Sequence, residues 1–475
     1  MSISADGSSV KRFPKDFVWG CATSSHQIEG GWLKGGKGLS IWDAFTHTPG
    51  KILHDANADV TCDHFHRFKE DVAIMADLGL RAYRFSIAWP RIQPAGTGKV
   101  NPEGIRFYSD LVDELVKHDI EPWVTMYHWD LPISLQLEHD GWLNPNIADY
   151  FADYAGILFE HLGDRVKRWI TLNEPWVTAI LGYGKGTFAP GRVSTSEPYV
   201  AAHNLLLAHA KTVDVYRRRY QPQQNGLIGI SNNCDWREPL TDTLEDRAAA
   251  STALEFFLGW FADPIYRGDY PEAMRENVGD RLPRFSAADR YLVEGSADFL
   301  GLNHYTTLYA SRPAPGEKVE LDVYGNGGII EDQHVKLTSD HAWPRTEMGW
   351  SVVPWGCAKL LRWIDDRYDR PTIYLTENGA AFDDVVEDGE VQDDRRIAFI
   401  RDYLASCHEA MSDGVDLRGY FVWSLMDNFE WAHGYSMRFG LYRVDFESLV
   451  RTPKASSRWY RDVIRSSSVE TAAAG

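Results

Sequence analysis

The feature that most constrains the fold of this chain is an alternation of short apolar runs with longer amphipathic segments, which continues from end to end. The runs are too short for helices and have the composition of buried β-strands. There are eight such runs, at residues 17–23, 82–89, 122–129, 168–173, 227–232, 299–305, 372–376 and 418–424. Helical spacing of apolar residues is clearest at residues 67–77, 104–118, 147–162, 200–220, 356–366 and 395–411.

Eight strand–helix units predict a parallel sheet that closes into a (β/α)8 TIM barrel. The chain has 475 residues, far more than the ~250 of a typical barrel, so we expect long βα loops. One of these should be the polar stretch 312–347, between the sixth and seventh strands. We predict one barrel domain over residues 13–465. It would be preceded by a disordered or extended tail over residues 1–12 and followed by a tail over residues 466–475.

Composition excludes several classes of protein. The net charge of −19 opposes non-specific binding to nucleic acid or to an anionic membrane surface. The five cysteines show neither metal-ligand nor disulfide spacing, which favours a reducing compartment. The first residues lack a signal-peptide pattern, and no apolar run is long enough to predict a transmembrane helix. We therefore expect a cytoplasmic protein with no nucleic-acid or membrane partner, and we leave its oligomeric state open.

Polar and aromatic residues follow nearly every predicted strand, and barrel enzymes place their chemistry at these strand ends. Glu174 follows the fourth strand and Glu377 follows the seventh. Two carboxyl groups across a barrel mouth, one protonated and one ionised, are what cleavage of a glycosidic bond requires. From topology alone, these glutamates are equally well explained as partners of basic neighbours such as Arg84.

Five motifs, which occur in order along the chain, favour the catalytic interpretation of these glutamates. They are ATSSHQIEG at 22–30, YHWDLP at 127–132, TLNEP at 171–175, TENG at 376–379 and WSLMDNFEW at 423–431. Together they resemble the motifs of glycoside hydrolase family 1, the retaining β-glucosidases and their relatives. The resemblance runs from about residue 13 to about residue 459.

The resemblance implies a role for each residue that matches a family motif. Glu174 would be the general acid/base and Glu377 the nucleophile. Arg84 and Tyr305 would orient Glu377 or tune its charge, together with Asn303. The residues expected to bind substrate are Gln27, His128, Trp129, Asn173, Asn303, Tyr305, Trp350, Trp423, Glu430, Trp431 and Phe439. Among these, Trp423 would stack beneath the sugar ring and Trp350 would lie at the aglycone site; Trp176 and Leu181 would line the entrance.

The residue types suit these roles. A nearby arginine favours an ionised nucleophile, and burial raises the pKa of a general acid. A buried His128 or Asn173 could instead be a core polar group with its hydrogen bonds satisfied. Met437 stands where family members commonly carry lysine, and Ser351 and Trp355 stand where acidic residues are more frequent. With Glu430 nearby, the absence of that lysine favours a neutral sugar over a sugar phosphate.

We expect no metal or organic cofactor. Gly38 replaces the Ser or Thr that a phosphate-binding loop at 31–38 would need. His64 and His66 are two residues apart and diverge on a helix. The expected activity is retaining hydrolysis of terminal β-D-glucosyl residues from cello-oligosaccharides and from aryl or alkyl β-glucosides. The alternatives are a broad β-glycosidase with fucosidase and galactosidase activity, or a catalytically inert sugar-binding barrel.

Overall fold

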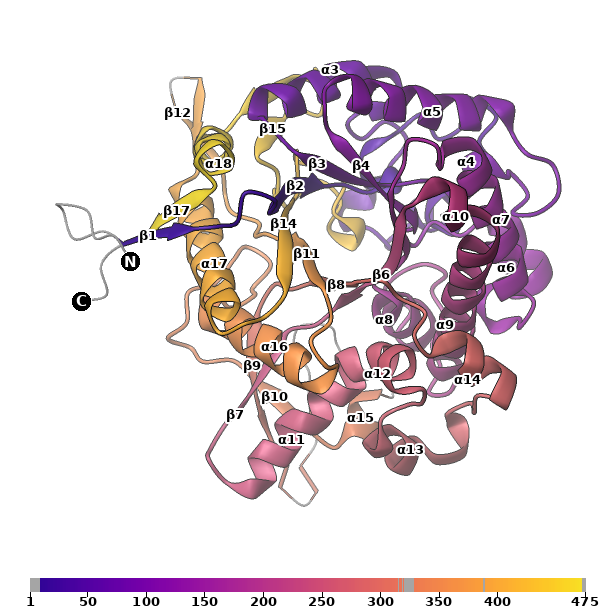
Figure 1. Cartoon of the computed structure of the whole chain (residues 1–475), viewed down its shortest axis with the longest axis vertical. Coiled ribbons are helices and arrows are strands. Elements are labelled where there is room, and N and C mark those ends of the chain that lie inside the picture. The colour runs from indigo at the N-terminus through magenta and orange to yellow at the C-terminus, as the bar shows by residue number, and fades with distance from the viewer. Residues whose placement is uncertain (1–8, 315, 318, 320–328, 388, 472–475) are drawn as a thin grey trace.

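The computed structural model describes residues 9–314, 316–317, 319, 329–387 and 389–471. Its centre is a closed barrel of parallel strands, which neighbour one another in the order β11-β14-β2-β3-β4-β5-β6-β8 (Figure 1). The barrel strands are β2 (Val18–Ala22), β3 (Ala82–Ser86), β4 (Glu121–Tyr127), β5 (Arg168–Asn173), β6 (Leu227–Asn233), β8 (Leu300–Asn303), β11 (Ile373–Asn378) and β14 (Leu417–Trp423). Each lies on one of the eight predicted runs, so the predicted barrel is confirmed.

Aromatic side chains fill the barrel below the level of the strand ends. The ring of Trp123 packs against Phe299, Tyr374 and Phe421, with centroid separations of 5.7, 4.7 and 5.0 Å. Gly20 makes room for this layer, because a Cβ atom at that position would come within 2.4 Å of the Phe421 ring. The layer is the floor beneath the strand ends, and the polar residues lie above it.

Helices surround the barrel (Figure 1). The six predicted ones appear as α3 (His64–Leu78), α5 (Pro102–Lys117), α7 (Ile147–Leu162), α9 (Glu197–Val215) continued by η4 (Tyr216–Tyr220), α16 (Pro354–Arg367) and α17 (Asp394–Ser412). In α5 the Asn101 side chain accepts a hydrogen bond from the amide of Glu103, and Pro102 starts the helix. The buried face of α5 carries Phe107 and Leu111, as the helical spacing predicts.

Further short elements belong to the loops and to the outer shell. The helices and turns are α1 (Ser25–Ile28), α2 (Ile41–Thr46), η1 (Leu53–Asp55), α4 (Trp89–Ile92), α6 (Ile133–His139), η2 (Gly141–Leu143), α8 (Pro175–Val177), η3 (Thr178–Gly184), α10 (Gln221–Gln224), α11 (Leu244–Leu254), η5 (Glu255–Gly259), α12 (Trp260–Arg267), α13 (Glu272–Val278), η6 (Gly279–Arg281), α14 (Ala287–Val293), η7 (Trp431–His433) and α18 (Ala455–Ser466). Two hairpins join β12 (Val385–Glu387) to β13 (Glu390–Gln392) and β15 (Tyr442–Val444) to β16 (Arg451–Pro453).

A small sheet outside the barrel was not predicted. It contains β7 (Trp236–Pro239), β9 (Thr307–Ser311) and β10 (Lys336–Thr338), in the order β10-β9-β7. β10 and α15 (Ile329–Gln333) lie in the stretch 312–347, so that stretch is not wholly a loop. Both elements are too short to give a periodic signal. Part of the stretch, at 315, 318 and 320–328, lies outside the described residues.

The first and last strands that the structure describes pair with each other. β1 (Ser9–Arg12) pairs antiparallel with β17 (Ser468–Thr471), side by side in Figure 1. The predicted tails fall partly outside the described residues, at 1–8 and 472–475, and the predicted domain boundaries stay a prediction. Within the described part of the chain, no helix is both long and apolar enough to cross a membrane.

Candidate active site

A cavity of about 1050 Å³ lies over the carboxyl ends of the barrel strands. The residues that line it and that the sequence predicted are His128, Trp129, Glu174, Trp176, Leu181, Tyr305, Trp350, Glu377, Trp423, Glu430, Trp431 and Phe439. The remaining predicted residues are Gln27, Arg84, Asn173 and Asn303. Each of them is hydrogen-bonded to at least one residue of the lining.

The carboxyl group of Glu377 is held from both sides. Glu377 lies on β11 and is 3% exposed. Arg84 donates from Nη1 to one carboxyl oxygen, and the Tyr305 hydroxyl donates to the other at 2.6 Å. Burial, followed by the charges of Glu377 and Glu174, raises the pKa of Tyr305 well above its ordinary value, so the hydroxyl keeps its proton. Two donors and one fixed positive charge therefore orient this carboxylate.

Glu174 lies in a different environment. It follows β5 with a left-handed backbone (φ 45°), and its side chain is 7% exposed. Asn303 donates to its Oε1 at 2.7 Å. Burial, followed by the charge of Glu377, raises the pKa of Glu174 well above its ordinary value. Its surroundings thus favour the protonated form of Glu174 more than water does.

Asn173 connects these groups. Its Oδ1 accepts hydrogen bonds from Arg84 Nη2 at 2.5 Å and from Asn303 Nδ2 at 3.0 Å, while its Nδ2 lies 3.0 Å from His128 Nε2. Burial, followed by the charge of Arg84, lowers the pKa of His128 well below its ordinary value, so the ring is neutral. Since the amide donates to Nε2, the ring proton is on Nδ1. That nitrogen is buried, has no partner among the described residues, and is free to donate to a ligand.

Glu430 and its neighbours form the other wall of the inner cavity. Gln27 Nε2 donates to Glu430 at 3.3 Å and to the carbonyl of Phe429 at 2.9 Å. Burial, followed by the charge of Glu377, raises the pKa of Glu430 to about 8. The Trp431 ring stacks on His26, with a centroid separation of 5.7 Å and an angle of 11° between the planes. Several donors, acceptors and aromatic rings therefore border the inner part of the cavity.

The outer part of the cavity has an apolar wall. The Trp176 ring packs on the Phe257 ring with a centroid separation of 4.8 Å. Leu181, in η3, lines the same cavity. Trp350 packs near Tyr305 at 5.2 Å. The structure thus places the three residues predicted for the aglycone site and its entrance in the wall of the cavity.

Sequence reasoning missed several residues of the wall. Asp235 and Arg237 follow β6 closely, so their place after a strand could have indicated them. Lys185 and Arg345 also line the cavity, but they lie in long loops far from any barrel strand in sequence. No local pattern marks them.

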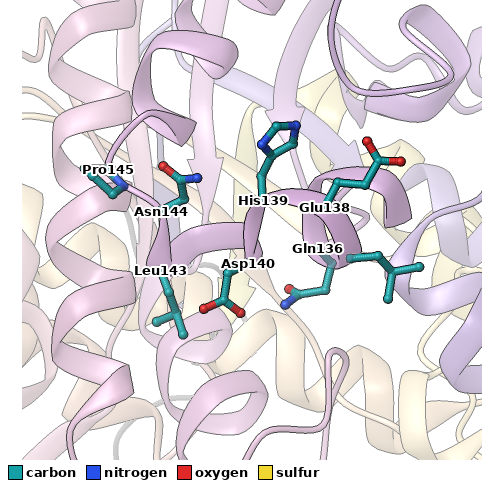
Figure 2. A pocket seen from close by; sticks show the side chains of 8 residues that line it. Gln136, Glu138, His139, Asp140, Leu143, Asn144 and Pro145 are labelled. Atoms are coloured by element: carbon teal, nitrogen blue, oxygen red, sulfur yellow. The ribbon is translucent and has the colours of Figure 1, made fainter.

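A second pocket, of about 600 Å³, lies at α6 and the turn that follows it. Figure 2 shows that Glu138 and His139 point to one side there, whereas Asp140 and Leu143 point to the other. These side chains do not converge on one ligand. Among the described residues, no three His, Cys, Asp or Glu side chains are grouped to hold a metal ion.

The sequence matches the profile of glycosyl hydrolase family 1 over residues 9–469. The chain belongs to glycosyl hydrolase family 1. Among its family 1 relatives, Beta-glucosidase 4 of Oryza sativa subsp. japonica is 47% identical, over 97% of this chain and 96% of the relative. Beta-glucosidase A of Thermotoga maritima is 46% identical, over 97% and 99% of the two chains. The chain is therefore an enzyme of the glycoside hydrolase class, as the motifs predicted.

Solved family 1 structures share the whole fold. The rice Os3BGlu6 β-glucosidase superposes with a TM-score of 0.91 at 45% identity, covering 94% of this chain and 98% of the other. The family 1 β-glucosidase of Thermotoga maritima gives the same TM-score and identity, with 97% and 100% covered. A mutant of the rice enzyme is known in a covalent complex with glucose.

Proposed function

We propose that this family 1 enzyme is a retaining β-glucosidase. Its substrates would be terminal, non-reducing β-D-glucosyl residues of cello-oligosaccharides and of aryl or alkyl β-glucosides. The observation that carries the proposal is the contrast between two buried carboxyl groups at one cavity. Glu377 is held by Arg84 and Tyr305, whereas burial and the charge of Glu377 raise the pKa of Glu174 and so favour its protonated form. This contrast supplies the nucleophile and the acid that a retaining glycosidase needs.

In the first step, a carboxylate oxygen of Glu377 attacks the anomeric carbon of the bound glucosyl unit. The bond from that carbon to the glycosidic oxygen breaks, and Glu174 gives its proton to the departing oxygen. The products are a glycosyl ester of Glu377, a free alcohol or phenol, and an ionised Glu174. The Arg84 guanidinium stays beside the ester and can stabilise the carboxylate as it leaves again.

In the second step, Glu174 takes a proton from a water molecule whose oxygen attacks the anomeric carbon. The ester bond to Glu377 breaks, β-glucose is released, and both carboxyl groups return to their starting protonation states. Two inversions give net retention of configuration. Loss of the Glu377 negative charge in the intermediate removes one cause of the raised pKa of Glu174, so this residue becomes an acceptable base.

The inner cavity would bind the glucosyl unit. His128 Nδ1 offers a donor, and the Glu430 carboxyl group, which Gln27 Nε2 holds in place, offers further hydrogen-bonding capacity. Asn173 fixes the His128 ring and the Arg84 guanidinium in place. The remaining positions assigned to sugar binding are Trp129, Trp423, Trp431 and Phe439, with Trp423 beneath the ring.

Two further points belong to this proposal. The five cysteines are buried and free, which supports action in a reducing compartment such as the cytoplasm. Cellobiose and short cello-oligosaccharides would then be breakdown products of cellulose. The similar proteins of rice and Thermotoga maritima carry the name β-glucosidase, which supports glucose as the sugar.

A panel of p-nitrophenyl glycosides tests the proposal. The specificity constants for the β-D-glucoside, β-D-galactoside and β-D-fucoside are measured beside that for cellobiose, and proton NMR follows the first-formed sugar. We expect rapid release of nitrophenol from the β-glucoside, with β-glucose appearing before the α-anomer. Comparable rates on the fucoside or galactoside would favour a broad β-glycosidase, and binding without turnover would favour a sugar-binding barrel.

A further inference from the structure

Three cations line the outer part of the active-site cavity, and the proposed mechanism uses none of them. Lys185, Arg237 and Arg345 come from the loops that follow β5, β6 and β8. These strands are neighbours in the barrel, so the three loops lie on the same side of its mouth. Buried or confined cations without anionic partners attract an anionic ligand.

Two of the cations lack a carboxylate partner. Lys185 is half-buried and makes no ion pair within 4.0 Å with any residue that the structure describes. Burial lowers the pKa of Lys185 to about 8, so the ammonium group remains charged at neutral pH but is incompletely hydrated. Arg345 donates to the carbonyl of Gly349 at 3.0 Å and to the Ser339 hydroxyl at 2.7 Å, and both of these partners are neutral.

Arg237 is partly compensated. Its guanidinium is 3.9 Å from Asp235 and 5.0 Å from the centre of the Phe257 ring. Asp235 in turn accepts hydrogen bonds from the backbone amides of Tyr305 and Thr306, so its charge is shared among several donors. On this side of the cavity, the positive charge that no carboxylate balances therefore belongs mainly to Lys185 and Arg345.

The inner end of the same cavity has the opposite character. Glu174, Glu377 and Glu430 lie there, and no described Lys or Arg lies within ion-pair distance of Glu430. The two ends of the cavity therefore differ, with carboxyl groups and no unpaired cation of the described residues around the sugar and uncompensated cations outside. An anion on the sugar would find no such free cation, whereas an anion on the aglycone would be attracted.

The wall beside the cations is apolar. Trp176, Phe257 and Leu308 line it, and the first two pack against each other at 4.8 Å. An aromatic ring can pack on such a wall while a substituent reaches the cations. The wall and the cations together specify one kind of group, an aromatic body that carries negative charge.

We infer that the aglycone site selects β-glucosides of aromatic carboxylic acids, with Lys185 and Arg345 binding the carboxylate of the aglycone. This inference rests on the proposed β-glucosidase function and specifies its substrate class. No additional chemistry is involved, since the carboxylate is bound and is not transformed. The free phenolic acid leaves with the proton of Glu174, as any other aglycone would.

The test compares two substrates that differ in one group. They are 4-carboxyphenyl β-D-glucoside and 4-carbamoylphenyl β-D-glucoside, which have similar shapes and of which only the first is anionic. The specificity constants are measured for the wild-type enzyme, Lys185→Gln, Arg345→Gln and the double variant. Lys117→Gln, on the exposed end of α5, is the control for loss of a surface lysine. The ratio of the two constants within one variant cancels differences in leaving group and in folded fraction.

We expect each single substitution to lower the ratio of carboxylate to carboxamide by about fivefold, and the double variant to lower it further. Lys117→Gln should leave the ratio unchanged. In the wild-type enzyme, raising the salt from about 0.02 M to about 0.5 M should lower the rate on the carboxylate alone, because salt screens the attraction. If the enzyme turns over both substrates well and neither the substitutions nor salt change the ratio, the inference is overturned. The proposed function would still stand. Turnover of neither substrate would instead contradict the proposed function.

Discussion

Glu430 lies at the sugar end of the cavity with its side chain partly buried and no described Lys or Arg within ion-pair distance. Met437, which packs against the cluster that contains Trp423 and Phe439, supplies no cation. A 6′-phosphate on cellobiose would have to be buried near Glu430 and Glu377 without a compensating charge. Burying a charge without a partner costs several kcal/mol, so we expect cellobiose to be cleaved at least about a hundredfold better than its 6′-phosphate. Steady-state kinetics on the two disaccharides checks this, and faster turnover of the phosphorylated one would contradict it.

The raised pKa of Glu430 predicts that the stability of the protein depends on pH. Burial and Glu377 raise the pKa of Glu430 to about 8, above the 4.5 of an ordinary glutamate. The folded state therefore holds a proton that the unfolded state releases, and the stability that this proton gives is lost as the pH rises from about 4.5 through about 8. Glu430→Gln removes the titrating group and therefore this loss of stability. We expect the unfolding free energy of the variant to rise relative to that of the wild type by up to about 1.4 kcal/mol per pH unit over this range.

Denaturant unfolding at pH 5, 6.5 and 8 measures this difference. Glu160→Gln, on the exposed face of α7, is the control for loss of one surface carboxyl. A difference between Glu430→Gln and the wild type that stays constant or falls with pH would show that Glu430 is ionised in the folded protein.

At the scale of elements, α8 and η3 shape the entrance. Trp176 is in α8 and Leu181 in η3, directly after Glu174, and both are buried in the cavity wall. A narrow apolar entrance leaves few polar groups to hold a product glucose there. We expect weak inhibition by glucose. Trp176→Ala, which widens the entrance, should lower the glucose concentration that halves activity by severalfold. Strong competitive inhibition that Trp176→Ala leaves unchanged would refute this.

A buried ion cluster fixes the segment that carries Glu430. Lys454, at the start of α18, donates to Asp427 at 2.7 Å and also to Asp384, and all three side chains are inaccessible to solvent. Although burial alone raises it, the charge of Lys454 helps to lower the pKa of Asp427 below its usual value. Lys454→Met would leave Asp384 paired with Arg396 and Asp427 paired with Arg438, and the loss of two charge-assisted hydrogen bonds should cost about 3–5 kcal/mol of unfolding free energy.

Arg458→Gln is the matched control, because Arg458 is on the same helix in an exposed pair with Glu390. It should change the unfolding free energy by less than about 1 kcal/mol. We further expect Lys454→Met to raise KM for the β-glucoside, since Asp427 is three residues from Glu430. A stable Lys454→Met enzyme with normal KM would show that the cluster does not hold the segment.

At the scale of the whole molecule, the barrel was predictable because its strands are buried on both faces and alternate with amphipathic helices. Strand β5 (Arg168–Asn173), for example, coincides with its predicted run. The inner site was predictable too, because Glu174 and Glu377 belong to contiguous motifs at strand ends. What could not be predicted depends on tertiary contacts. Lys185 and Arg345 face the cavity only because long loops fold back over it, and the short strands β7, β9 and β10 pair only when the barrel brings them together.

The tautomer of His128 is a further example. Its proton position follows from the Asn173 amide at Nε2, a contact between the residue after β4 and the last residue of β5 that no spacing in the sequence reveals. Motif matching could suggest that His128 binds sugar, but only the folded contact indicates that Nδ1 is the donor.

The central claim is that Glu377 is the nucleophile and Glu174 the acid/base, and azide separates the two roles by stereochemistry. Glu377→Gly leaves a space on the α-face of the sugar, so azide should react with an activated β-glucoside to give the α-glucosyl azide. Glu174→Ala should still form the glycosyl ester when the leaving group needs no proton, and azide should then give the β-glucosyl azide. Both variants should lose more than about a thousandfold in activity on cellobiose, since acid/base assistance alone contributes about 10²–10⁴. Proton NMR reads the anomer from the coupling at C1: opposite anomers from the two variants are the predicted result, and the same anomer from both would contradict the assignment.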